Sequence, residues 1–267
     1  MTADKDNKPS GFLRVFKIGG NVVDNPEALD RFLRDFVRID GPKALVHGGG
    51  KEATRLSSAL GIETTMIEGR RVTTRETLDV VTMVYAGLIN KRVVAKLQAL
   101  GCDAIGLTGA DGNCIRATRR PAKPIDYGFV GDIDPKDIDS GFIMKLIKSG
   151  CVPVFCAITH DGEGTLLNCN ADSVASAVAM AMSREMPTDL IFCFEKEGVL
   201  EDVDNPDSLV EHIDPSVYAS LKKRGAVNAG MIPKIDNAFK AIDNGVGSVT
   251  IKHSDNILND RGTKISR

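Results

Sequence analysis

The chain has 267 residues and a mass of 28.6 kDa, which suits one large α/β domain or two fused lobes around a sizeable core. Its 34 basic and 36 acidic side chains leave a formal net charge of −2, which excludes a general positive field for nucleic acid or an anionic membrane. No apolar run approaches the ~18 residues that a membrane span needs, and the N-terminus lacks the apolar core of a secretory signal. The six cysteines form no C-x-x-C pair, so we expect reduced thiols and a cytoplasmic protein.

Apolar runs alternate with amphipathic stretches along the chain, after a polar segment, 1–11, that we expect to be a disordered tail. Asn25 and Pro26 are typical of a helix start, and Gly101 is typical of the residue that ends a helix. In chain order, the expected strands are 12–18, 43–47, 103–107, 152–158, 189–194 and 248–253. The expected helices are 26–39, 51–60, 76–100, 135–149, 171–185, 215–224 and 232–244.

Between the third strand and the helix expected at 135–149, two short β-like pieces, 114–118 and 129–133, predict a hairpin around a basic loop. Elsewhere, apolar strands that alternate with helices predict an open, mainly parallel sheet covered on both faces. Ligands of such sheets bind at the carboxyl ends of the strands. The loops that follow the strands are therefore the candidate site.

Two of these loops are rich in glycine. Lys17 leaves the first strand before a glycine pair, and His47 leaves the second strand before the three glycines 48–50. Glycine lets backbone N–H groups approach an anion, and consecutive N–H groups form a concave anion site. The triple-glycine loop is not a Walker A loop, because Leu45 and Glu52 occupy positions that the motif reserves for Gly and Ser or Thr.

Three further loops carry charged or amide groups. Arg70 and Arg71 follow a glycine, and arginine suits bidentate recognition of a carboxylate. Asn170 is placed to cap the next helix, with Asp172 in its first turn, where a carboxylate is favoured and also able to hold two lysines. Lys234 opens the last helix, where a positive charge is unfavourable unless it serves an anion. Each feature alone is also explained by a turn, a cap or a solvated side chain.

Taken together, the loops resemble the amino acid kinase family, and within it the branch that acts on acylglutamates. The matching pieces, over residues 12–266, are Lys17-x-Gly19-Gly20, His47-Gly48-Gly49-Gly50, Gly69-x-Arg71-Val72-Thr73, Ile105-Gly106-Leu107-x-Gly109-x-Asp111-Gly112, Val130-Gly131, Asn168-x-Asn170-Ala171-Asp172, Gly230-Met231-Ile232-x-Lys234 and Gly262-Thr263. The resemblance implies a three-layer α/β/α sandwich with a central, mainly parallel sheet. It also implies a homodimer whose N-terminal lobe, 12–184, binds the acyl-amino acid and whose C-terminal lobe, 185–267, binds the nucleotide.

The reaction that the resemblance implies is phosphoryl transfer from MgATP to the γ-carboxylate of an N-acyl-L-glutamate, N-acetyl-L-glutamate foremost, giving an acyl phosphate for arginine synthesis. A carboxylate is ionised at pH 7, so the task is to bring two anions together without a general base. By the same resemblance, the catalytic residues are Lys17, Lys234 and Asp172, the substrate-binding residues are Gly49, Gly50, Arg71 and Asn168, and the nucleotide-binding residues are Gly19, Gly20, Glu195 and Met231. No residue is assigned to a metal, because Mg²⁺ arrives with ATP and keeps much of its water.

The chain departs from the family pattern in three places. The family usually has a Thr/Ser–Asp pair after the strand that ends here at Phe194, where this chain has Glu195. Arg70 stands where the family commonly has an apolar residue, so N-succinyl-L-glutamate stays open as the substrate. Only the segment 1–11 precedes the first strand, so we expect a dimer without arginine feedback, which light scattering of an arginine-sensitive hexamer would contradict.

Other functions remain open at this stage. Another small-molecule kinase of the same family shares the scaffold. A dinucleotide-dependent oxidoreductase would use Gly48-x-Gly50-x-x-Ala53 as its cofactor loop, but this function leaves Lys17, Asp172 and Lys234 unexplained. A catalytically silent ligand sensor would have no use for those three charges.

Overall fold

Buried strands form one sheet at the centre of the molecule, in a computed structural model that describes residues 11–202, 205, 207–226 and 231–267. The strands are β1 (Leu13–Ile18), β2 (Lys43–His47), β5 (Ala104–Leu107), β8 (Val152–Cys156), β11 (Thr188–Phe194), β12 (His212–Ile213), β13 (Val249–His253) and β14 (Thr263–Ile265). Within the described residues, this eight-stranded sheet has the order β12-β14-β13-β11-β1-β2-β8-β5. Every neighbouring pair is parallel except β13 and β14, which confirms the mainly parallel sheet.

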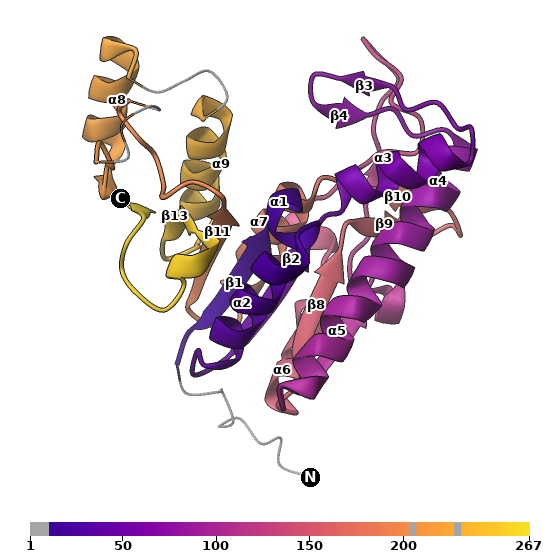
Figure 1. Ribbon diagram of the computed structural model, residues 1–267, viewed down its shortest axis with the longest axis horizontal. Coiled ribbons are helices and arrows are strands. Elements are labelled where there is room, and N and C mark those ends of the chain that lie inside the picture. The colour runs from indigo at the N-terminus through magenta and orange to yellow at the C-terminus, as the bar shows by residue number, and fades with distance from the viewer. Residues whose placement is uncertain (1–10, 203–204, 206, 227–230) are drawn as a thin grey trace.

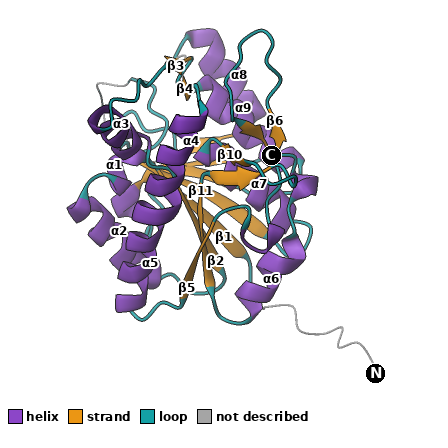
Figure 2. Cartoon of the chain, turned by 90° about the vertical axis from the view of Figure 1, so that its right-hand side faces the viewer, coloured by secondary structure: helices purple, strands orange, loops and turns teal. Residues whose placement is uncertain are grey.

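Helices cover both faces of this sheet, with α2 and α5 on one side and α6 and α7 on the other (Figure 2). The helices are α1 (Gly20–Val23), α2 (Pro26–Val37), α3 (Gly50–Ala59), α4 (Arg75–Thr82), α5 (Asn90–Ala99), α6 (Ser140–Lys148), α7 (Ala171–Met182), α8 (Pro215–Arg224) and α9 (Ile232–Asp243). The three-layer α/β/α architecture is thus confirmed. In the described part of the chain, no helix is both long enough and apolar enough to cross a membrane.

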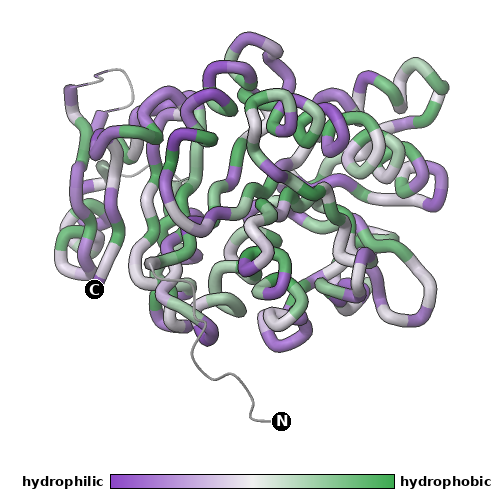
Figure 3. Tube along the Cα trace, turned by 90° about the horizontal axis from the view of Figure 1, so that it is seen from below, coloured by the Kyte–Doolittle hydropathy of each residue, from purple (hydrophilic) through white to green (hydrophobic). Residues whose placement is uncertain are grey.

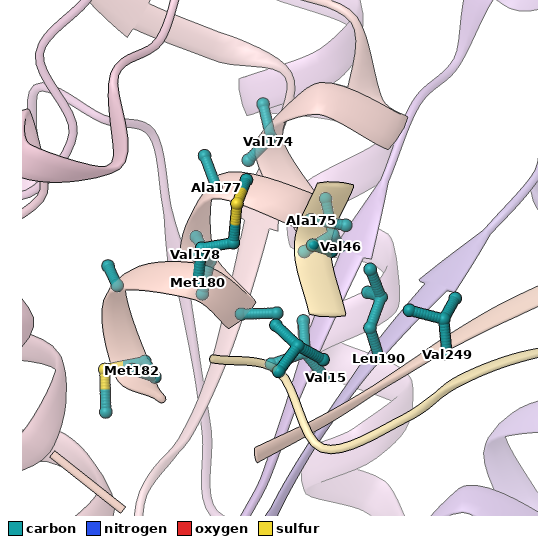
Figure 4. Packing of buried hydrophobic residues seen from close by; sticks show 14 of the residues in the cluster. Val15, Val46, Val174, Ala175, Ala177, Val178, Met180, Met182, Leu190 and Val249 are labelled. Carbon is teal, nitrogen blue, oxygen red and sulfur yellow. The ribbon is translucent and has the colours of Figure 1, made fainter. Parts of the chain in front are cut away.

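Helix α7 is made almost entirely of small and apolar residues because it packs on the sheet and is flanked by other helices of the same layer. Its residues from 174 to 182 are all buried, and they pack on Val15, Val46, Leu190 and Val249 of the central strands (Figure 4). Small side chains let a helix approach a sheet closely. The close approach holds the N-terminus of α7 over the carboxyl ends of β1 and β2.

The opposite face of the sheet has its own apolar core, which includes an aromatic group. The ring of Phe36 in α2 lies 5.3 Å from that of Phe16 in an edge-on contact and 5.8 Å from that of Phe32 in a stacked one. Along the chain, apolar and hydrophilic residues alternate in short runs, as expected for elements with one buried side (Figure 3). The six cysteines are free, and four of them are buried.

The helix caps that the sequence predicts are present. The side chain of Asn25 accepts hydrogen bonds from two N–H groups of the first turn of α2, which begins at Pro26. Asn170 caps α7 in the same way, accepting from the N–H groups of Asp172 and Ser173 at 2.8 and 3.2 Å. Gly101 has a φ of +75° where the long helix ends. These local signals determine where the helices start and stop.

The helix predicted over 76–100 is present but is not uniform. It consists of α4 and α5 joined by a π-helical segment, η1 (Met83–Ile89). The helix predicted over 135–149 is wrong as a single element, because a short 3₁₀ turn, η3 (Pro135–Asp137), is followed by extended backbone at Ile138. Ile138 forms a bridge with Ile115, and Asp139 then caps α6, so long-range pairing prevails over local helical preference.

Several short β-hairpins lie at the ends of the central sheet. The hairpin predicted between 111 and 134 exists as β6 (Thr118–Arg119) and β7 (Gly131–Asp132). The sequence analysis missed two others, β3 (Met66–Ile67) with β4 (Arg70–Arg71), and β9 (Ile158–His160) with β10 (Leu166–Asn168). Strands of two or three residues are too short to show a period-two pattern. Figure 1 shows the β3–β4 hairpin beyond α3 and α4, at the end of the molecule where the candidate loops gather.

Candidate active site

Two of the predicted catalytic residues form an ion pair. Lys17 is near the carboxyl end of β1, and Asp172 lies in the first turn of α7. The Nζ of Lys17 is 2.6 Å from Oδ1 of Asp172, and the two side chains are 9% and 33% exposed. Asp172 also lines a cavity between α7 and α9, so the ion pair adjoins that cavity. Asp172 therefore holds the Lys17 ammonium in place at the strand end.

The third predicted catalytic residue, Lys234, reaches the same point from α9. Its Nζ lies 3.9 Å from the centroid of the Phe194 ring, and the Nζ of Lys17 lies 5.1 Å from that centroid. Burial lowers the pKa of Lys234, Asp172 and Glu195 oppose this shift, and the charge of Lys17 adds to it. Two ammonium groups thus converge on one ring and share one nearby carboxylate. This excess of positive charge suits a polyanion.

A cavity of about 360 Å³ lies beside Lys234, between α7 and α9. Its apolar lining comes from the side chains of Ala177, Met180, Phe192, Phe194, Ile133 and Ile251. Its charged lining includes Arg70, Lys234, Lys240 and the ion pair of Arg120 with Asp132. The cavity therefore combines an apolar floor with a surplus of cations.

The triple-glycine loop lines a second cavity, of about 230 Å³, which shares Arg70, Arg120 and Ser173 with the first. The backbone N–H groups of Gly49 and Gly50 donate no hydrogen bond to any other described residue. Unpaired N–H groups at the start of a helix are an anion site. The loop thus provides the concave set of donors that the sequence predicts.

Close packing explains why the middle residue of this loop is glycine. A Cβ on Gly49 would lie 2.3 Å from Cδ1 of Ile89, whereas a Cβ on Gly50 would meet nothing within 4 Å. We therefore expect Gly49→Ala to lower the free energy of unfolding by about 1–3 kcal/mol through overpacking. The matched variant, Gly50→Ala, should stay within about 0.5 kcal/mol of the unchanged protein. Equal stabilities of the two variants in denaturant titrations would contradict this account.

Arg71 is buried in the wall of the second cavity, with 7% of its surface exposed. Its guanidinium donates to the carbonyl of Gly50 at 2.9 Å, to Oγ1 of Thr54 at 2.9 Å and to Oγ1 of Thr64 at 3.2 Å. Among the described residues, no carboxylate lies within ion-pair distance of Arg71. A buried cation with no counter-charge among the described residues is suited to an anionic ligand.

Asn168 lines the same cavity from the end of β10. Its Nδ2 donates to Oγ1 of Thr73 at 3.0 Å, and that hydroxyl donates to the backbone carbonyl of Arg71 at 3.1 Å. The chain of bonds ties Asn168 to the strand that carries the guanidinium. The structure therefore brings together the four residues that the sequence assigns to the substrate: Gly49, Gly50, Arg71 and Asn168.

The residues assigned to the nucleotide are more scattered. The N–H of Gly19 donates to the carbonyl of Cys193 at 3.2 Å and so belongs to the sheet, while Gly20 lines the cavity of the glycine loop. Met231 precedes α9, directly before the turn that carries Lys234. Gly230, which belongs to the same motif, lies outside the described residues. Gly19 thus lies beside Lys17, and Met231 lies one turn before Lys234.

Glu195 follows β11 and lines a third cavity, of about 480 Å³, together with Asn21 and Asp24. Burial favours the neutral form of Glu195, but its own backbone N–H, the side chain of Asn21 and the charge of Lys234 outweigh burial and lower its pKa. Glu195 is therefore a carboxylate within the field of Lys234. Its side chain lines the cavity beside α1 and is not part of the lining of the cavity between α7 and α9.

Two side chains in the site escaped the sequence analysis. Arg120, from the basic loop of the β6–β7 hairpin, lines both main cavities and is held by Asp132. Tyr85, from the π-helical segment, lines the second cavity, where burial raises its pKa and Arg71 opposes the rise. The helical pattern marks Tyr85 only as a core residue, and nothing local distinguishes Arg120 from its basic neighbours.

Comparison with known proteins agrees with this geometry. The acetylglutamate kinase of Cytophaga hutchinsonii is 51% identical to this chain, over 92% of this chain and 93% of its own. The acetylglutamate kinase of Methanopyrus kandleri is 38% identical, over 94% of this chain and 99% of its own.

Several solved structures also resemble this chain. The crystal structure of smu.665 from Streptococcus mutans UA159 has a TM-score of 0.75 at 28% identity and covers 95% of this chain and 98% of its own. The carbamate kinase from Giardia lamblia bound to AMP-PNP has a TM-score of 0.70 at 15% identity, over 97% and 99%, a likeness of fold alone. Residues 13–253 match the model of the amino acid kinase family, and the chain therefore belongs to that family.

Proposed function

We propose that the protein transfers the γ-phosphoryl group of ATP to the γ-carboxylate of N-acetyl-L-glutamate, giving an acyl phosphate in arginine biosynthesis. The observation that carries this proposal is the convergence of Lys17 and Lys234 on Phe194, next to a cavity lined by Arg71, which has no ion pair with a described carboxylate. Family membership and the acetylglutamate kinases at up to 51% identity support the reaction and the substrate. The protein is then a phosphotransferase with a carboxyl group as acceptor.

In this reaction an oxygen of the γ-carboxylate forms a bond to the γ-phosphorus, and the bond from that phosphorus to the bridging oxygen of ADP breaks. Arg71 would bind the α-carboxylate of the substrate, and Asn168 would bind its acylamino group. The N–H groups of the glycine loop would bind the other anionic end of the substrate, its γ-carboxylate. Lys17 and Lys234 would stabilise charge on the transferring phosphoryl oxygens, with Asp172 orienting Lys17. No proton transfer is needed, because the nucleophile is already ionised.

For the nucleotide, we propose that the phosphates lie along Gly19 and Gly20 toward Lys234, with Met231 and Glu195 on the side of the base. A Cβ on Gly19 would lie 3.9 Å from Nζ of Lys17, so this glycine leaves room beside the ammonium. Mg²⁺ would be carried by the phosphates of ATP and neutralise part of their charge. Asp172 is already engaged by Lys17, which supports a metal held by phosphate and water.

The wider organisation is also a proposal. We infer an N-terminal lobe, 12–184, for the acyl-amino acid and a C-terminal lobe, 185–267, for the nucleotide, because Arg71 and Asn168 lie in the first and Lys234 in the second. We also infer a cytoplasmic homodimer. The exposed side chains of Met83 and Leu88 on the long helix support a second copy as the partner, and light scattering would measure it.

A second candidate substrate, N-succinyl-L-glutamate, is favoured by one observation. Arg70 is exposed, lies in the wall shared by both main cavities, and has no ion pair with a described carboxylate. The succinyl group would add a carboxylate that such a guanidinium binds well. The same reaction would then act on a substrate with one more negative charge.

The test is ADP release with MgATP and a panel of N-acetyl-L-glutamate, N-succinyl-L-glutamate, L-glutamate and UMP, with hydroxylamine to trap an acyl phosphate. We expect turnover of an N-acylglutamate only. If the succinyl compound is preferred, Arg70→Leu should raise its KM by roughly 10-fold or more and leave that of the acetyl compound nearly unchanged. Turnover of UMP alone would contradict the proposal, and NADH binding without ATP binding would point to an oxidoreductase.

A further inference from the structure

A chain of buried hydrogen bonds ends on the triple-glycine loop. His47, the last residue of β2, is 0% exposed, and Asn90, the first residue of α5, is 1% exposed. The Nδ1 of His47 lies 2.8 Å from the carbonyl oxygen of Gly48, and its Nε2 lies 3.1 Å from Nδ2 of Asn90. Neither His47 nor Asn90 lines the two main cavities. Any effect they have on a ligand must therefore pass through the loop.

The surroundings of Asn90 determine which nitrogen of His47 carries the proton. Oδ1 of Asn90 lies 3.2 Å from Nζ of Lys91, a group that can only donate, so this atom is the amide oxygen. Nδ2 therefore donates one hydrogen to the carbonyl of Val154 at 2.9 Å and the other to Nε2 of His47. Because Nε2 accepts, the ring proton is on Nδ1 and is donated to Gly48.

The imidazole is neutral in this arrangement. Burial lowers the pKa of His47 to about 4, the bond to the Gly48 carbonyl opposes the shift, and the charge of Lys91 adds to it. A neutral ring with Nδ1–H is a donor of constant geometry over the pH range in which the protein works. The ring thus links Asn90 of α5 to Gly48 of the loop through two hydrogen bonds of fixed direction.

Two neighbouring elements are shaped to admit this network. A Cβ on Gly106 of β5 would lie 1.8 Å from Oδ1 of Asn90, so only glycine leaves space for the amide. The π-helical segment Met83–Ile89 directly precedes Asn90, and its side chains Tyr85 and Ile89 fill the space that a Cβ on Gly49 would occupy. π-Helical turns inside α-helices are frequently found at functional sites. The long helix therefore supports the loop at two adjacent glycines.

We propose that His47 and Asn90 are positioning residues for the phosphoryl transfer, an inference that rests on the function proposed above. Nδ1–H of His47 holds the carbonyl of Gly48, so that the N–H groups of the loop stay turned toward the cavity. Donors that are already oriented cost no reorganisation when negative charge develops. A carbonyl released from His47 is free to rotate and to present its negative end to the anions.

A matched pair of variants tests this role. His47→Asn keeps a side-chain N–H close to the position of Nδ1, whereas His47→Gln places its amide near Nε2 and loses the donor to Gly48. We expect His47→Gln to lower kcat by roughly 10- to 100-fold, with the KM for both substrates within about 3-fold, because small misplacements at a reacting centre have effects of this size. His47→Asn should retain most of kcat. Equal losses of kcat in the two variants, or a loss carried by KM alone, would overturn the proposal.

A second measurement needs neither a variant nor turnover. Long-range ¹H–¹⁵N correlation spectra of the histidine rings, in the full chain, report the tautomer of His47 directly. We expect a neutral ring protonated at Nδ1 from pH 5 to pH 8, given the pKa of about 4. A ring protonated at Nε2, or one that titrates in this range, would overturn the network even in an active enzyme. If the unchanged protein turns over no N-acylglutamate, the proposed function fails, and the tautomer still decides the network.

Discussion

Replacing Lys234 by methionine should lower kcat by roughly 10²–10³-fold, because one positive donor to the transferring phosphoryl group is lost. The Nζ of Lys234 is poised 3.9 Å over the Phe194 ring, and the only other ammonium at that ring is Lys17 among the described residues. Methionine preserves the length and most of the volume of the side chain. The effect on kcat, measured by ADP release at saturating substrates, therefore reports the charge.

The control is Lys240→Met, in the same helix and at the same cavity but two turns away, which should keep kcat within about 3-fold of the unchanged enzyme. Lys234→Arg supplies a second readout. Burial lowers the pKa of Lys234, and the reaction needs its protonated form, so kcat falls as the pH rises through that lowered pKa. Arginine stays charged, so the alkaline limb should move to higher pH. If the alkaline limb of the kcat profile stayed at the same pH in Lys234→Arg, Lys234 would not be the group whose protonation the reaction needs.

Replacing Arg71 by leucine should lower kcat/KM for the acylglutamate by roughly 10²-fold or more, mainly through KM, because a buried charge pair with the substrate is lost. Three hydrogen bonds, to Gly50, Thr54 and Thr64, hold the guanidinium in one orientation before any substrate arrives. The α-carboxylate of the substrate would therefore bind a guanidinium group that is already oriented. Steady-state kinetics with both substrates varied would separate this effect from one on ATP.

The matched control for Arg71 is Arg55→Leu. Arg55 is on α3, its side chain is 71% exposed, and its partner is Glu52 on the same helix. We expect its removal to leave the KM values of both substrates unchanged, since Arg55 and its partner form an exposed pair that water screens. Arg71→Lys should fall between the two variants, because an ammonium cannot form the bidentate contact. A rise in the KM of ATP alone would place Arg71 on the nucleotide and contradict the assignment.

Much of the fold could be predicted from the sequence because its signals are local. The central strands are buried on both faces, so each is an apolar run, and the helix starts at Asn25 and Asn170 have side chains that satisfy their own first turn. The helix over 135–149 was wrong for the opposite reason. The bridge from Ile138 to Ile115 joins residues far apart in the chain, and no local pattern records it.

Some residues of the candidate site could likewise be predicted from the sequence, and others could not. Lys17, Asp172 and the glycine loop are readable because parallel strands bring their carboxyl ends to one edge, so a loop after one strand lies near the loop after the next. Arg120 and Tyr85 are not readable, because the first depends on how the β6–β7 hairpin folds back and the second on the π-helical turn. The link from Asn90 to His47 depends on the start of α5 lying over the neighbouring strands β2 and β8.

From the amino-acid pattern alone one can infer the class of fold, the strand ends that carry chemistry and the types of charge found there, since these follow from burial patterns and caps along the chain. The tertiary structure was needed to show that Lys17 and Lys234 share the Phe194 ring, that Arg71 is buried with no counter-charge among the described residues, and that His47 is hydrogen-bonded to Gly48 of the glycine loop. Each of these depends on distances between residues on different elements. Such distances are set by strand order and helix packing, which no single segment of the sequence contains.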